Sequence, residues 1–355
     1  MKKIFLSILY LTVFQLSAQN NKFSAEISPW FQNKPGAISI SFDDASYTQY
    51  EYAYPVLEKY GLKATFGLVG EWTKENATYS AEPGMFQIKK MGWKEIRELQ
   101  KKGYEIAAHG YLHQKYGKFL PVDTLVKQMK KIKNLIEAHT RKTVYTLHYP
   151  YSFTSDHIVS AANKSGFLFA RTGDNFQYVS YGNFNPHLLY SQPILNDTIP
   201  NDKNFSTWLK NTKGKWMILM YHHLFPDSSK EMKIMRYHNV LHTYSLLPAT
   251  FDRQMKMVAE SGYWIAPEYQ VGKYMIERLH TEIKLKKWCK TLYIKAKTDL
   301  DTQIYNQKLT ILIRTPWHKI KILRKNKKEI QTLTDGLLSI DIYPGERLKI
   351  KKLSQ

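Results

Sequence analysis

The chain has 355 residues, of which 43% are hydrophobic and 23% are charged, and a formal net charge of +22. This length can bury a sizeable core and predicts one large domain and one small one. The single cysteine, Cys289, excludes an intrachain disulfide and a thiolate metal cluster. Any metal must therefore be bound by histidine and carboxylate side chains.

The N-terminus has the three zones of a secretory signal peptide: a basic start, an apolar stretch over 4–16, and the small residues around Ala18. We expect cleavage after Ala18, which assigns 1–18 to the signal peptide. The apolar stretch is shorter than the ~20 residues of a membrane span. The sequence thus predicts an exported protein, periplasmic or extracellular, with no membrane span.

One local pattern occurs four times: a helical stretch, a glycine that stops it, and an apolar strand. The four strands follow Gly61, Gly103, Gly166 and Gly262, over 63–68, 104–108, 167–170 and 263–266. Three more strands are expected at 38–42, 144–147 and 216–220. Nearly continuous apolar strands that alternate with helices predict an α/β fold with a parallel sheet. We expect 19–275 to form a distorted, seven-stranded (β/α) barrel.

Polar residues gather where these expected strands end. They are Asp43, Asp44, His109, His148, Asp174, His222 and His223. Barrel enzymes place their chemistry at the carboxyl ends of the strands. The sequence therefore predicts that these side chains meet in one site.

After Tyr274 the texture of the sequence changes. We expect a charged linker over 276–290 and a small all-β domain over 291–355. From Ile283 onward there are 18 Lys and Arg residues against 6 Asp and Glu residues. No nucleic-acid motif accompanies this charge, so nucleic acid is not an expected partner. A solvated lysine-rich face or contact with an anionic glycan accounts for it.

Two adjacent aspartates, Asp43 and Asp44, close the first apolar run. Neighbouring residues of an extended chain point to opposite sides, so one carboxylate can bind a metal while the other stays free as a base. His109 and His113 are four residues apart, which suits binding of one ion by both imidazoles. The spacing alone is weak evidence, because His238 and His242 share it within an apparent insertion. Together the first pair and the aspartates indicate a metal-assisted hydrolase.

These residues resemble two motifs of the polysaccharide deacetylases of carbohydrate esterase family four, which have the NodB homology domain. Ser41-Phe42-Asp43-Asp44 is similar to the motif Thr-Phe-Asp-Asp. His109-Gly110-Tyr111-Leu112-His113 is similar to His-(Ser/Thr)-x-x-His, with glycine in place of the hydroxyl residue. The resemblance covers roughly 34–274 and implies a NodB-type barrel. It also implies that Asp43 is the general base and that Asp44, His109 and His113 bind the metal.

The remaining family motifs match less well. His148-Tyr149-Pro150-Tyr151 keeps half of Arg-x-Pro-Tyr: His148 replaces the arginine that orients the base, and the backbone amide at Tyr151 remains for the oxyanion. The region of Asp174 matches the fourth motif poorly. After the last catalytic strand, His222 is in register for the general acid, with His223 as the alternative.

The sequence thus predicts an exported, metal-dependent hydrolase that removes N- or O-linked acetyl groups from a polysaccharide. Zn²⁺ is the expected cofactor, with Co²⁺ or Ni²⁺ as alternatives, because all three suit two imidazoles and a carboxylate. A second hypothesis is a carbohydrate-binding protein on a deacetylase scaffold, in which catalysis is impaired by the missing arginine. A third is that the basic C-terminal domain anchors the protein on an anionic surface.

Overall fold

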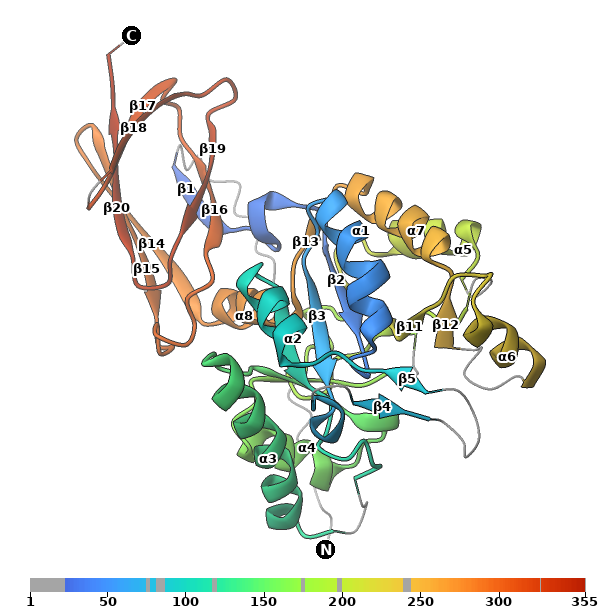
Figure 1. Cartoon of the computed structure of the whole chain (residues 1–355). Coiled ribbons are helices and arrows are strands. Elements are labelled where there is room, and N and C mark those ends of the chain that lie inside the picture. The colour runs from blue at the N-terminus through green and yellow to red at the C-terminus, as the bar shows by residue number, and fades with distance from the viewer. Residues whose placement is uncertain are drawn as a thin grey trace, which may run out of the picture.

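The computed structural model describes residues 23–354, except 75–76, 81–86, 117–119, 174–175, 197–199, 239–243 and 326. Figure 1 shows two parts, an α/β part built around one curled sheet and a β part that contains the C-terminus. The expected signal peptide lies outside the described residues. Among the described helices, none is long and apolar enough to cross a bilayer.

The α/β part is built on a parallel sheet that contains all seven predicted strands. They are β2 (Ala37–Phe42), β3 (Ala64–Leu68), β6 (Glu105–Ala108), β7 (Thr146–His148), β8 (Phe169–Arg171), β10 (Trp216–Tyr221) and β13 (Trp264–Ile265). The order along the sheet is β8-β7-β6-β3-β2-β10-β9, where β9 (Gln192–Pro193) is a short eighth strand and β13 pairs with the start of β2. The predicted fold class is confirmed.

The sheet curls until its two ends almost meet. Leu189 forms a parallel bridge with Arg171 at the end of β8, and three residues later β9 pairs with β10. The segment 186–193 therefore spans the gap between the first and last strands of the curl. Side chains at the carboxyl ends of strands far apart in the sequence are brought together by this curvature.

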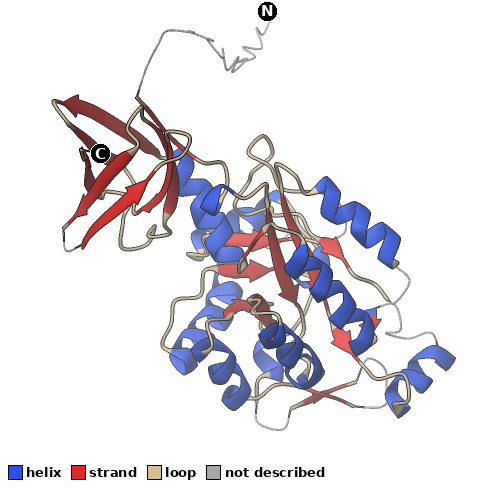
Figure 2. Cartoon of the chain, turned by 90° about the horizontal axis from the view of Figure 1, so that it is seen from above, coloured by secondary structure: helices blue, strands red, loops and turns tan. Residues whose placement is uncertain are grey.

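Helices cover the outside of the curled sheet, as Figure 2 shows. They are α1 (Tyr54–Lys59), α2 (Trp93–Lys101), α3 (Val122–Thr140), α4 (Asp156–Lys164), α5 (Asp202–Asn211), α6 (Lys230–His238), α7 (Pro248–Glu260) and α8 (Glu268–Leu279). The glycines predicted to stop four of them all have positive φ, between 64° and 88°. Helix α3, for example, buries an apolar stripe formed by Leu125, Met129, Ile132 and Ile136.

Short elements sit in the connections between strands. They are the single-turn helices at Phe31–Asn33, Gly70–Trp72 and Pro150–Ser152, the π-helix Gln49–Ala53, and two small ribbons, β4 (Thr78–Tyr79) with β5 (Ile88–Lys89) and β11 (His223–Leu224) with β12 (Ser245–Leu246). The β11–β12 ribbon follows β10 directly. It fixes the backbone just beyond His222.

The β part is a sandwich of two antiparallel sheets. The larger contains β14 (Thr281–Trp288), β15 (Thr291–Thr298), β20 (Arg347–Lys352), β17 (Lys319–Arg324) and β18 (Lys327–Thr332), in that order. The smaller contains β1 (Ser24–Ile27), β16 (Leu309–Arg314) and β19 (Leu337–Ile342). The predicted C-terminal all-β fold is therefore confirmed. The stretch 276–290, predicted as a linker, holds the end of α8 and all of β14.

The two parts share a hydrophobic cluster. Trp264 and Tyr274 from the α/β part belong to the same buried cluster as Ile311 and Ile313 of β16. The Tyr274 hydroxyl also donates a hydrogen bond to the Ser28 carbonyl, 2.8 Å away. Continuous burial and a buried polar contact hold the sandwich against α8.

Candidate active site

The carboxyl ends of β2, β6, β7 and β10 surround a pocket of about 320 Å³. It is lined by Asp43, Asp44, Trp72, Tyr79, His109, His113, Lys115, Tyr149, Tyr151, Ser152, Met220, His222, His223 and Tyr244. All six site residues predicted from the sequence are in this set. The strand ends that were predicted to converge thus meet at one edge of the sheet.

Asp44, His109 and His113 form a cluster that could hold a metal ion, since one ligand atom from each lies within 4.8 Å of the others. Asp44 Oδ1 is 3.5 Å from His109 Nε2 and 3.3 Å from His113 Nε2. A tetrahedral ion with bonds of about 2.0–2.2 Å requires ligand atoms roughly 3.3–3.6 Å apart. Asp44 Oδ1 is buried and has no hydrogen-bond partner among the described residues. The donor set and this orphaned oxygen fit a divalent metal.

Both imidazoles suit this role. His109 Nδ1 lies 3.1 Å from the His148 carbonyl oxygen, and a hydrogen bond donated there leaves the lone pair on Nε2, which faces Asp44. Burial lowers the pKa of His113 to about 4, so this ring is neutral near pH 7. A neutral imidazole is the form that binds a metal.

Asp43 is buried, and its two carboxylate oxygens have different surroundings. Oδ1 accepts hydrogen bonds from His148 Nδ1, 2.7 Å away, and from Arg171. Oδ2 faces the pocket, 3.9 Å from His109 Nε2 and 4.0 Å from His222 Nε2. One oxygen is therefore held in place while the other stays available for chemistry.

A buried charge network lies behind Asp43. Glu268, the first residue of α8, is 3.3 Å from His148 Nε2 and 3.6 Å from Arg171 Nε. Two acids and two bases thus alternate around a closed ring of contacts, and all four are buried. Because burial of an isolated charge is very costly, this pairing is what makes the charges tolerable.

The pKa values of the network follow from the same contacts. Burial disfavours the charged form of Asp43, but Arg171, His109 and His148 outweigh it and hold the pKa well below the usual range. For His148, burial and Arg171 oppose protonation, while Glu268 and Asp43 outweigh them and raise the pKa. Asp43 is consequently a carboxylate near neutral pH.

His222 and His223 occupy different sides of the pocket. His222 Nε2 lies 4.0 Å from Asp43 Oδ2, and its ring contacts Tyr244 at a centroid distance of 4.8 Å. His223 Nε2 lies 3.9 Å from Asp44 Oδ2. Burial lowers the pKa of both histidines, that of His223 to about 3. His222 is thus the neighbour of Asp43, and His223 the neighbour of the metal cluster.

The structure explains why Gly110 replaces a hydroxyl residue in the second motif. Its φ is 78°, and a Cβ there would lie 2.9 Å from the Pro150 ring. Non-glycine residues with positive φ also cluster here: Asp44, Ala45, His113, Tyr151 and Ser152. Such strained backbone is typical of functional sites.

Several site residues were missed by the sequence argument. Arg171 and Glu268 complete the buried network. Lys90 is buried, and its Nζ donates to the Asp44 carbonyl oxygen at 3.1 Å and lies 4.1 Å from the centroid of the Trp72 ring. Burial lowers the pKa of Lys90 to about 8, although Asp44 opposes this.

Aromatic side chains make up part of the pocket wall. Tyr149 and Tyr151 line the pocket, whereas Tyr111, Tyr116 and Phe176 do not. The structure adds Trp72, Tyr79 and Tyr244. Asp174 and His242 lie outside the described residues, as does the side chain of His238.

Residues 32–170 match the family model described as polysaccharide deacetylase. Over this stretch the chain is similar to polysaccharide deacetylases. The match contains Asp43, Asp44, His109 and His113, and it ends one residue before Arg171. His222 and Glu268 lie beyond it.

A curated relative of this chain is the poly-β-1,6-N-acetyl-D-glucosamine N-deacetylase of Staphylococcus aureus. It is 29% identical over 139 residues, which cover 37% of this chain and 45% of the relative. The chain thus spans less than half the length of the curated relatives of this name.

Two solved structures are also similar. One is a carbohydrate esterase family four pseudoenzyme from Bacillus anthracis, with 17% identity, coverage of 68% of this chain and 66% of that one, and a TM-score of 0.44. The other is a family 4 acetyl xylan esterase from Clostridium thermocellum in complex with a cobalt ion, with 16% identity, coverage of 68% and 91%, and a TM-score of 0.44.

Proposed function

We propose that this protein is an exported, metal-dependent hydrolase that removes acetyl groups from a polysaccharide. The observation that carries the proposal is the arrangement of the two adjacent aspartates. Asp44 Oδ1, which has no hydrogen-bond partner among the described residues, faces the imidazoles of His109 and His113. Asp43 is held through Oδ1 and presents Oδ2 to the pocket. A ligand beside a free carboxylate is what hydrolysis by an activated water requires.

Asp44, His109 and His113 would hold the ion, which we propose to be Zn²⁺, with Co²⁺ or Ni²⁺ as alternatives. When bound, the ion would polarise the acetyl carbonyl and acidify a water molecule. His109 is oriented for this by the His148 carbonyl, and His113 by its contacts with Trp72 and Tyr151.

Asp43 Oδ2 would act as the general base. It takes a proton from water, whose oxygen attacks the acetyl carbonyl carbon. The backbone amide of Tyr151, on the rim of the pocket, would donate to the oxyanion. A donor of this kind is worth roughly 3–4 kcal/mol of transition-state stabilisation.

His222 would act as the general acid. Its Nε2 lies 4.0 Å from Asp43 Oδ2, close enough for the proton taken from water to pass between them as the side chains adjust. Protonated His222 then gives that proton to the departing amine or alcohol as the bond to the acetyl carbon breaks. Acetate and the free sugar group leave. We prefer His222 to His223 because His223 faces Asp44 instead.

Arg171 supports catalytic competence despite the missing arginine of the third motif. The sequence assigned the task of orienting the base to His148, but Asp43 Oδ1 contacts both His148 and Arg171. A cation with a permanent charge is therefore present at the base, supplied by β8. The missing arginine of the third motif is therefore weaker support for the hypothesis that catalysis is impaired.

We propose an acetylated polysaccharide as substrate, because Trp72, Tyr79, Tyr151 and Tyr244 surround the pocket and aromatic faces can pack against sugar rings. The N-deacetylase activity named for the S. aureus relative favours an N-acetyl amino sugar. An ester needs the same tetrahedral chemistry, so both linkages belong in the test. The basic C-terminal domain would provide a further contact with an anionic glycan.

The test is acetate release from chitin oligomers, poly-N-acetylglucosamine and acetylated xylan by the Zn²⁺-loaded protein. Asp43→Asn should lower the rate by about 10²–10⁴-fold, since it removes the general base but spares the metal ligands. Metal content should stay at the wild-type level. Asp252→Asn is the matched control, because Asp252 pairs with Lys59 on the surface and should release acetate normally.

Equal rates for Asp43→Asn and the wild type would contradict the proposal. If no metal-loaded protein releases acetate while a glycan still binds, the carbohydrate-binding hypothesis replaces it.

A further inference from the structure

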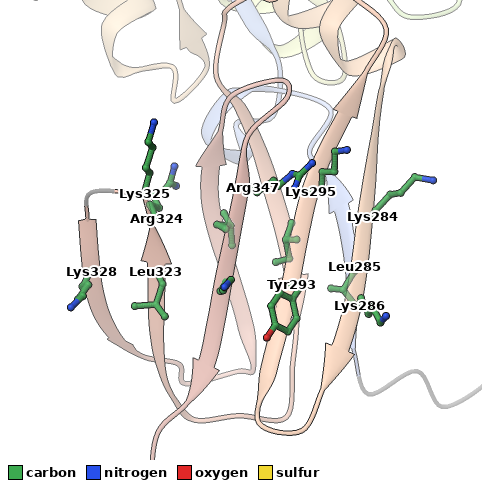
Figure 3. A pocket seen from close by; sticks show the side chains of 13 residues that line it. Lys284, Leu285, Lys286, Tyr293, Lys295, Leu323, Arg324, Lys325, Lys328 and Arg347 are labelled. Carbon is green, nitrogen blue, oxygen red and sulfur yellow. The ribbon is translucent and has the colours of Figure 1, made fainter.

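The outer face of the five-stranded C-terminal sheet forms a hollow of about 1060 Å³, far from the strand ends that carry the deacetylase site. Figure 3 shows its side chains projecting from β14, β15, β17 and β18. Alternate residues of this sheet, such as Leu292, Ile322 and Ile350, are buried in the sandwich core, so the cations of the hollow project from the other face. We call this hollow the basic groove. Six of its cations are Lys284, Lys286, Lys295, Lys328, Arg347 and Lys349.

The strand register places these cations side by side. Lys284 of β14 is directly opposite Lys295 of β15, and Lys295 is directly opposite Arg347 of β20. Adjacent strands are about 4.8 Å apart, so the three side chains form a row of closely spaced like charges. Like charges directly opposite one another destabilise a sheet. The fold therefore maintains an unfavourable arrangement that an anionic ligand would relieve.

Few carboxylates neutralise the groove. Lys284 has Glu282 at 3.3 Å, and Arg324 has Glu346 at 2.9 Å. Within the described part of the chain, Lys286, Lys295 and Arg347 form no ion pair. On ordinary protein surfaces, positively and negatively charged side chains are interspersed, whereas in this groove the positive charges dominate. The groove is thus a site of uncompensated positive charge.

The groove also offers an apolar floor. A second cross-strand row runs Lys286, Tyr293, Lys349, Leu323 and Lys328 over all five strands. It places an aromatic ring and an aliphatic side chain between cations, and Lys349 Nζ lies 5.4 Å from the Tyr293 ring centroid. Rings that stack on Tyr293 would bring anionic groups to the lysines on either side.

We propose that the basic groove binds an anionic polysaccharide, one whose sugar rings carry carboxylate or sulfate groups. A chain of regularly spaced anions can neutralise several neighbouring cations at once, and its rings suit the Tyr293 floor. A flat membrane surface fits a hollow poorly. The choice of a polysaccharide over other polyanions rests on the proposed function of the deacetylase site. The groove would hold the polymer while its acetyl groups are removed elsewhere.

The experiment measures binding of the full-length protein to polygalacturonate and dextran sulfate, with neutral dextran as the uncharged comparison. The variant is Lys295→Gln/Arg347→Gln/Lys349→Gln. Its matched control is Lys203→Gln/Lys210→Gln/Lys213→Gln, which removes the same charge from exposed positions in and just after α5. We expect the wild type and the control to bind both acidic polymers at low salt and to ignore dextran.

The groove variant should bind about tenfold more weakly at low salt, and the difference should shrink at high salt as the charges are screened. Tyr293→Ser should weaken binding of polygalacturonate but not of polyphosphate, which has no rings. Equal binding by the groove variant and the wild type would overturn the inference. So would tighter, groove-dependent binding of acidic phospholipid vesicles or single-stranded DNA.

Binding is measured without turnover, so this inference and the catalytic proposal can fail separately. If the protein binds polygalacturonate through the groove but releases no acetate, the groove inference stands and the catalytic proposal is wrong. If the protein releases acetate but its binding does not depend on the groove, the catalytic proposal stands and the groove inference is wrong. The groove variant should release acetate from a short neutral oligosaccharide at the wild-type rate.

Discussion

The candidate active site and the basic groove accommodate charged side chains in opposite ways. Around Asp43, four charged side chains are buried and each touches partners of opposite sign. On the C-terminal sheet, Lys284, Lys295 and Arg347 stand in one row and share the same sign. Burial makes pairing obligatory in the first region, whereas water screens the repulsion in the second. The side chains around Asp43 are thus held in fixed positions, whereas the cations of the groove can attract anions over a longer range.

The largest expected effect comes from removing one member of the buried network. Arg171→Met should lower the free energy of unfolding by about 3–5 kcal/mol, because it leaves Glu268 and Asp43 with one cation between them. Urea denaturation measures this. Adding Glu268→Gln should recover part of the loss, since it removes the charge left without its partner. If the two losses simply add, the network is not coupled.

A second prediction concerns the buried histidines of the metal-free protein. The pKa of His113 is about 4 when folded, against about 6.5 for an unfolded histidine, so the unfolded chain binds more protons between these values. The contribution of neutral His113 to the free energy of unfolding is therefore complete above about pH 6.5. It is lost as the pH falls toward about 4, and the loss is at most about 3 kcal/mol.

Urea unfolding at neutral and mildly acidic pH checks this prediction. His113→Gln should flatten the pH dependence of the free energy of unfolding, and substitution of the exposed His318 should not. A metal-free protein whose stability is the same at both pH values would contradict the argument.

A third prediction tests how precisely the network sets the base. A Cβ at Gly67 would lie 2.5 Å from His148 Nδ1 and 3.2 Å from Asp43 Oδ1, so Gly67→Ala must displace one of them. Acetate release should fall about 10–100-fold, because small misplacements of reacting groups are costly. Metal binding should persist, since the proposed ligands are untouched. Gly182→Ala is the control, because its Cβ would meet nothing closer than 3.8 Å. A wild-type rate for Gly67→Ala would refute the prediction.

The smallest expected effect has the opposite sign. Removing charge from the groove with Lys295→Gln should raise the free energy of unfolding at low salt by roughly 0.2–1 kcal/mol, since it removes a like-charge neighbour on each side. The gain should vanish at high salt. Thermal unfolding at two salt concentrations measures it, and a loss of stability at low salt would show that the row is not repulsive.

The sequence predicted the strands, the glycine-stopped helices and the meeting of Asp44, His109 and His113, because these depend on local patterns. Apolar runs mark strands, and parallel strands end at one edge of a sheet. The partners of Asp43 could not be predicted in this way. Arg171 is 128 positions from Asp43, and their contact depends on how far the sheet curls.

Other omissions have the same cause. Glu268 and Lys90 have no local feature that separates them from surface residues, yet both are buried. The connection between β3 and α2 carries Lys90 to the carbonyl oxygen of Asp44. The stretch 276–290 misled the sequence argument because β14 is an exposed edge strand whose charged residues resemble a linker.

Strand β1 has a consequence for how this chain is made and cut. Ser24–Ile27 pairs with β16, so the smaller sheet joins segments that are more than 280 residues apart in the sequence. During synthesis β1 has no partner until β16 has been made. Truncation after α8 would strip β1 of its neighbour and expose a pairing edge, which is prone to association between molecules. The properties of a truncated protein would therefore reflect the disrupted β1–β16 pairing. Point substitutions test the function of the sandwich without this disruption.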